Sequence, residues 1–92
     1  MKYVVKFKPS AAKSLRALNR ADQKKIGARI NSLADNPRPA GVINLEAKKS
    51  LYRVRMGDYR IIYQIKDNIL IVLVVAIGHR KDIYNKLQRF KV

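Results

Sequence analysis

The sequence predicts a single α+β domain, in which an antiparallel-rich sheet of four strands carries a helical hairpin on one face. Three observations support this fold class. The chain has 92 residues, which is enough for one domain. Apolar residues alternate near its beginning and recur in three short segments after residue 50, as in strands. Between these regions they recur every three or four positions, as in helices. The expected order is β-α-α-β-β-β-α, with a short C-terminal helix at the end.

The first strand is expected over residues 1–8, because its apolar side chains alternate with lysines. Pro9 and Ser10 end this strand. Ser10 is also a suitable N-cap for a first helix that carries Leu15 and Leu18. The strand is therefore expected to bury one face and to lead directly into the helical hairpin.

Asn19 is the expected N-cap of the second helix, and Asp22 adds a carboxylate to its first turn, where the helix dipole favours negative charge. One apolar stripe follows at helical spacing: Ile26, Ile30 and Leu33. The basic residues of the two helices are interpreted as solvated faces: Lys13, Arg16, Lys24, Lys25 and Arg29. The Asn-Pro-Arg-Pro segment at 36–39 stops the second helix, and a loop is expected from there to about Ser50.

Three further strands are expected over residues 51–56, 59–66 and 69–77, separated by Gly-Asp and Asp-Asn turns. The last of them is apolar at every position, which is typical of a central strand. After Gly78, one apolar stripe predicts the C-terminal helix: Ile83, Tyr84, Leu87 and Phe90.

The composition is strongly basic, with 21 Lys and Arg residues against six Asp and Glu residues and a net charge of +15. Self-repulsion of this size destabilises a compact state, so a polyanionic partner is indicated: nucleic acid, an acidic protein or an anionic membrane surface. Solubility alone is the alternative. Residues 1–15 lack the apolar stretch of a signal peptide, and residues 69–77 are too few to span a bilayer, so a cytosolic protein is expected. With no cysteine and one histidine, neither a disulfide nor a structural zinc site is expected.

Three arginines are expected to converge on one face of a hairpin. A two-residue turn at Gly57 and Asp58 places Arg55 opposite Arg60, with Arg53 diagonal to Arg60. Facing like charges destabilise a sheet, so their presence indicates a function. Guanidinium groups gathered in this way suit bidentate binding of phosphate oxygens. A merely solvated outer face is the alternative, and a longer turn would shift the register.

The segment after the last strand adds side chains with different chemistry: His79, Arg80 and Tyr84. In metal-free RNA cleavage, a ribose 2′-OH attacks the neighbouring phosphate. That reaction requires a stabiliser of negative charge, a base and an acid. Histidine ordinarily titrates near neutrality, which suits proton transfer. The alternative is that His79 is structural and that Tyr84 belongs to the apolar stripe of the last helix.

These two segments, residues 51–65 and 78–84, resemble the RelE/ParE toxin superfamily and in particular its RelE branch. The resemblance covers essentially the whole chain. It implies a RelE-like microbial RNase fold and a ribosome-dependent endoribonuclease that cuts mRNA in the A site without metal or cofactor. It also implies a toxin of a type II toxin–antitoxin system that acts in the cytoplasm on ribosomes and mRNA. Its expected partner is an acidic, partly disordered, RelB-like antitoxin.

The resemblance implies catalytic roles for six residues: Arg53, Arg55, Arg60, His79, Arg80 and Tyr84. It implies RNA binding by five: Arg53, Arg55, Arg60, Arg80 and Lys81. Arg53 and Arg55 stand where the family often has lysines, and an arginine cannot be deprotonated in a protein. Proton transfer would then fall to His79, to Tyr84, to groups of the ribosome and substrate, or more remotely to Glu46.

Two other functions remain compatible with the sequence. The first is a ParE-like poison of DNA gyrase, which would use the same fold without RNA chemistry. The second is a non-catalytic basic module that binds RNA or an acidic protein by charge. Such a module would bind with steep salt dependence and would leave RNA uncut even on translating ribosomes.

Overall fold

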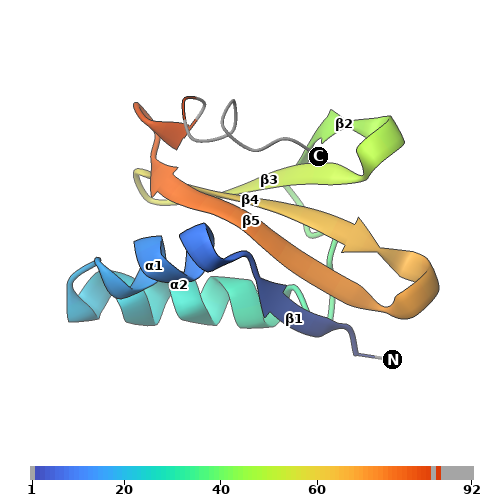
Figure 1. Cartoon of the computed structure of the whole chain (residues 1–92), viewed down its shortest axis with the longest axis horizontal. Coiled ribbons are helices and arrows are strands. Elements are labelled where there is room, and N and C mark those ends of the chain that lie inside the picture. Colours follow the sequence, from blue (N-terminus) through green and yellow to red (C-terminus); the bar gives the residue numbers. More distant parts are fainter. Residues whose placement is uncertain (1, 84, 86–92) are drawn as a thin grey trace.

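The computed structural model of the protein describes residues 2–83 and 85. One mixed sheet of five strands, in the order β1-β5-β4-β3-β2, is covered on one face by both helices (Figure 1). All neighbouring strands are antiparallel except β1 and β5. The elements are β1 (Val4–Phe7), α1 (Pro9–Arg16), α2 (Arg20–Ser32), β2 (Ile43–Glu46), β3 (Leu51–Met56), β4 (Tyr59–Lys66) and β5 (Ile71–His79), with 3-10 turns at Ala47–Lys49 and Asp67–Ile69. No helix of the described part of the chain is long and apolar enough to cross a membrane.

The predicted α+β class and the helical hairpin on one face are confirmed, but the prediction of four strands was wrong. The segment expected to be a loop contains β2, which pairs antiparallel with the first residues of β3. This strand has only four residues, three of them exposed, so no alternation of buried and exposed positions marks it in the sequence. The expected C-terminal helix involves Tyr84 and later residues, and it lies outside the described residues.

The starts of three elements test the local predictions. Asn19 caps α2 as expected, since its Oδ1 accepts a hydrogen bond of 2.9 Å from the backbone N–H of Asp22. Ser10 does not cap α1, which instead begins at Pro9 with Lys8 as N-cap. Proline suits the first helical position because it has no N–H to leave unpaired there. The last strand begins at Ile71, two residues later than expected, because the preceding 3-10 turn ends in Leu70 with φ 54°.

Hydrophobic residues are buried on both faces of the sheet. The helix-side core joins the apolar stripe of α2 to Val54, Ile61 and Tyr63 of the hairpin. On the opposite face, called here the open face because neither helix covers it, a second and smaller core contains Leu51, Ile62, Val75, Ala76 and Ile83. Burial on both faces explains why β5 is apolar along most of its length.

A hydrogen-bonded cluster fixes the loop that follows α2. Arg38 donates from Nη1 and Nη2 to the two carboxylate oxygens of Asp67 at 3.2 and 2.8 Å, and from Nε to the Tyr52 hydroxyl at 3.2 Å. Tyr3 donates its hydroxyl to the same carboxylate. The buried hydroxyl of Tyr63 donates to the carbonyl oxygen of Pro37, which belongs to the same loop, at 2.7 Å. This cluster ties the loop to the residue before β1, to β3 and β4, and to the turn before β5.

The cluster predicts a measurable acid dependence of stability. Hydrogen bonds from Arg38, and then from Tyr3, lower the pKa of Asp67 from 3.8 to about 2. Because the folded-state pKa is the lower one, the ionised carboxylate stabilises the fold fully above pH 3.8 and this contribution is lost as the pH falls to about 2. Asp67→Asn should therefore lose less thermal stability than the wild type over this interval. The control is Asp35→Asn, because the Asp35 carboxylate is exposed and lies 3.7 Å from the Lys2 ammonium. If the melting temperatures of Asp67→Asn and the wild type fell equally with pH over this interval, the account would be contradicted.

Candidate functional site

The three hairpin arginines lie on the open face, as the sequence predicts. A two-residue turn joins β3 to β4, with Gly57 at φ 60°, and the register pairs Arg55 with Arg60 and Met56 with Tyr59. Arg53 pairs with Ile62, whose side chain belongs to the open-face core. Directly opposite residues project from the same face of a sheet. The predicted convergence of the arginines is therefore confirmed.

These arginines line a hollow of about 330 Å³, called here the arginine pocket. A volume of this size suits a small ligand or one unit of a larger one. The lining residues come from α2, the loop after it, and three strands: Arg29, Ala40, Gly41, Ile43, Arg53, Arg55 and Arg60. None of these described residues is acidic, so the described lining is positively charged. The pocket is chemically suited to an anion with several oxygen acceptors.

Arg60 has a guanidinium that is fixed by hydrogen bonds to the hairpin turn. It is half-buried, and its Nη1 donates to the carbonyl oxygens of Gly57 at 3.3 Å and Tyr59 at 3.2 Å. Arg55 is exposed directly opposite it, and Arg53 is half-buried. The hairpin thus presents one anchored cation beside a more accessible one.

His79 does not join the arginines, because a β-bulge in β5 places it on the helix side of the sheet. Ile62 pairs with Ala76 while its neighbour Tyr63 pairs with Val74, so β5 contains one extra residue at this point. The extra residue reverses which face each later side chain of β5 occupies. His79 consequently pairs with Tyr59 on the helix side of the sheet.

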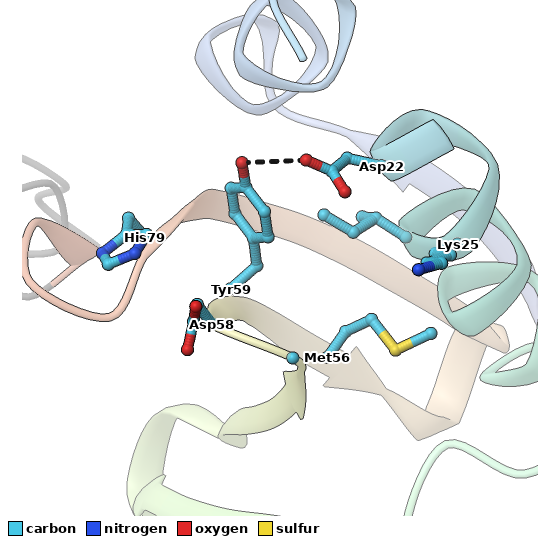
Figure 2. Close-up of a pocket in the computed structure, with 8 residues that line it drawn as sticks. Asp22, Lys25, Met56, Asp58, Tyr59 and His79 are labelled. Carbon is cyan, nitrogen blue, oxygen red and sulfur yellow. Dashed lines mark hydrogen bonds between the residues drawn. The ribbon is translucent and has the colours of Figure 1, made fainter. Parts of the chain in front are cut away.

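His79 instead lines a second hollow, of about 500 Å³, between the hairpin and α2 (Figure 2). Its ring contacts the Tyr59 ring edge-on, with centroids 6.0 Å apart. The Tyr59 hydroxyl donates to Oδ2 of Asp22 at 3.2 Å. Burial raises the pKa of Tyr59, and the hydrogen bond to Asp22 raises it further. This hydroxyl therefore stays protonated and holds the hairpin against α2.

The remaining predicted site residues lie around the hairpin turn or away from it. Arg80 is exposed, and its backbone N–H donates to the carbonyl oxygen of Asp58 at 2.8 Å, which holds it beside the turn. Lys81 is also exposed. Tyr84 lies outside the described residues. Glu46 is in the edge strand β2, with its carboxylate 3.9 Å from the Lys49 ammonium.

Arg29 is a residue of the arginine pocket that the sequence did not indicate. The sequence predicts that Arg29 belongs to a solvated helix face, but it is half-buried and lines the pocket. Helical periodicity alone could not distinguish it, because α2 has basic residues at several positions around its axis. No three His, Cys, Asp or Glu side chains in the described part of the chain are grouped to hold a metal ion.

The fold and the arginine pocket define a small, strongly cationic α+β protein with clustered arginines on a hairpin. Residues 5–84 match the family described as "ParE toxin of type II toxin-antitoxin system, parDE". A RelE-like toxin protein of Escherichia coli is 34% identical over 89 residues, which span 92% of this chain and 93% of that protein. The chain therefore belongs to the RelE/ParE superfamily of toxins of type II toxin–antitoxin systems.

Solved structures agree with this assignment. In the archaeal RelE–RelB complex from Pyrococcus horikoshii OT3, the matched chain has 30% identity and a TM-score of 0.78. That match covers 87% of this chain and 97% of the archaeal one. A variant of E. coli RelE in the free state has a TM-score of 0.79 at 22% identity, over 99% of this chain and 100% of the other, and supports the fold.

Proposed function

We propose that this toxin is a RelE-like, ribosome-dependent endoribonuclease that cleaves mRNA in the A site and so inhibits translation. The observation that carries the proposal is the arginine pocket. Arg53, Arg55 and Arg60 lie together on the face of the hairpin that the helices leave open. Their guanidinium groups match the geometry of phosphate oxygens and remain charged at every physiological pH.

In this mechanism the arginines hold the scissile phosphate and stabilise the negative charge that develops on it. Fixed donors of this kind act mainly in the transition state, because they are already oriented before the reaction starts. Arg60 is suited to this role by its hydrogen bonds to Gly57 and Tyr59. Arg80 and Lys81 are proposed to bind the RNA backbone beside the hairpin turn.

The 2′-OH proton must go to a group other than the arginines, and the leaving 5′-oxygen must receive one. His79 points to the opposite face of the sheet, toward Tyr59, and we propose that it supports the hairpin there. We accordingly assign proton transfer to Tyr84 or to groups of the ribosome and the mRNA. No metal or cofactor takes part in this proposal.

The proposed protein partner is an acidic, partly disordered antitoxin. Structurally similar RelE toxins have been solved in complex with RelB. In the protein described here, the net charge of +15 and the arginine pocket, whose described lining has no acidic residue, favour a partner that brings carboxylates to the open face.

Expression of the toxin without its antitoxin is expected to arrest growth and to produce new mRNA 5′ ends aligned with codons of translated frames. Mapping these ends by primer extension is the measurement. Arg20→Ala, which removes one charge outside the arginine pocket, should still give the cuts. Growth arrest with intact message would contradict the proposal.

A gyrase poison is the second candidate, because the matching family description names ParE. It predicts DNA damage with uncut message in the same arrested cells. Measuring both the message ends and the DNA breaks in one culture separates the two functions. The arginine pocket favours the ribonuclease, since a gyrase poison has no phosphoryl transition state to stabilise.

A further inference from the structure

Arg29 belongs to the helix layer, yet it shares a pocket with arginines of the open face. This is possible because, among the described strands, β2 pairs with β3 only from Leu51 to Arg53 and no described strand borders the rest of β3 on that side. The arginine pocket is lined from both sides of this edge, by Arg29 of α2 and by Arg53 and Arg55 of β3. An occupant of the pocket can therefore contact side chains from both sides of the sheet.

The surroundings of Arg29 leave its guanidinium available to a ligand. It forms no ion pair with any described residue, and its backbone carbonyl accepts a hydrogen bond of 2.6 Å from the Ser32 hydroxyl. Burial raises the pKa of Tyr63, and the charge of Arg29 opposes that rise. Arg29 is half-buried and lines the arginine pocket from α2, whereas Arg55 and Arg60 line it from the hairpin.

The number of guanidinium groups exceeds what one phosphate needs. A phosphodiester has two non-bridging oxygens, and the three hairpin arginines already offer more donors than these oxygens can accept. Next to the pocket, Gly41 has φ 85° and no heavy atom within 4 Å of the position where a Cβ would lie. The backbone of a bound strand consequently has open space beside Gly41 as it passes from the hairpin toward Arg29.

We propose that Arg29 binds a second phosphate of single-stranded RNA, adjacent to the phosphate held by Arg53, Arg55 and Arg60. The RNA backbone then crosses the uncovered edge of β3, and the pocket selects a polynucleotide over an isolated phosphate. This inference rests on the proposed function, because it assumes that the arginine pocket is an RNA site.

The test compares Arg29→Gln with Arg20→Gln, which makes the same change at the exposed first residue of the same helix. Binding is measured on 2′-O-methyl oligouridylates with one, two and three phosphates, which cannot undergo 2′-OH attack. Arg29→Gln should bind the one-phosphate ligand like the wild type and the three-phosphate ligand roughly tenfold more weakly. Its slope of log affinity against log salt should be about 0.7 shallower, which corresponds to one lost phosphate contact.

Arg29→Lys separates a binding role from a structural one. Lysine keeps the charge, so this variant should recover most of the salt slope, whereas a role in packing would lower the melting temperature of both Arg29 variants alike. Arg55→Gln is measured in parallel. If Arg55→Gln weakens binding while Arg29→Gln behaves like Arg20→Gln, the second-phosphate site is overturned and the proposed function stands. If neither variant differs from Arg20→Gln, the arginine pocket is not an RNA site and both proposals fall.

Discussion

Replacing Arg60 with alanine is expected to lower the rate of mRNA cleavage on translating ribosomes by about two to three orders of magnitude. The guanidinium is held in place before any ligand arrives, through its hydrogen bonds to the carbonyl oxygens of Gly57 and Tyr59. A donor fixed in this way needs no reorganisation when negative charge develops on the phosphate, so its loss affects the transition state more than substrate binding. Single-turnover cleavage of a defined message on programmed ribosomes, with saturating toxin, measures this step.

The same hydrogen bonds give Arg60 a role in the hairpin itself, so a second variant is needed. Arg55→Ala removes an exposed guanidinium from the opposite position of the ladder, and its effect on the turn should be small. It should also reduce cleavage, while Arg20→Ala should not. If Arg60→Ala and Arg55→Ala both melt like the wild type and both cleave at the wild-type rate, the arginine pocket has no part in the chemistry.

Ile62→Ala is expected to give a large loss of stability, about 2–5 kcal/mol. Ile62 is 0% exposed and lies in the small core of the open face. The cavity left by its truncation has few neighbours that can move in to fill it. Domains of this kind are stable by only about 5–15 kcal/mol, so the variant should unfold at much lower denaturant concentration.

Ile69→Ala is the matched control, because the same side chain is 56% exposed in the turn before β5. Its free energy of unfolding should stay within about 0.5 kcal/mol of the wild type. Denaturant unfolding of both variants at equal protein concentration is the measurement. Equal stabilities would mean that the open-face core contributes little to the fold, against the burial observed.

The sequence predicted those features that depend on local chemistry. The Gly-Asp turn fixed the register that pairs Arg55 with Arg60, and the Asn19 cap marked the start of α2. The predictions from the sequence were wrong where a structural feature depends on tertiary contacts. Strand β2 is short and exposed, so only its pairing with β3 makes it a strand.

Two features of the site were inaccessible for related reasons. The bulge in β5 occurs within a run of apolar residues, where shifting the phase by one residue changes no visible pattern, so nothing in the sequence assigned a face to His79. In the sequence, Arg29 cannot be distinguished from the other basic residues of α2. Only the packing of α2 beside β3 places it in the arginine pocket. The positions of His79 and Arg29 both depend on how neighbouring strands and helices pack, and not on the sequence of any single element.

Strand β1 pairs only with β5 among the described strands, and Val4 is matched with Ile71. During synthesis, the first strand therefore has no partner until almost the whole sheet has left the ribosome. Contacts between such distant segments form late, since the chain entropy lost in closing the loop must be offset first. A protein proposed to attack translating ribosomes thus completes its own sheet only after β5 has emerged from the ribosome that makes it.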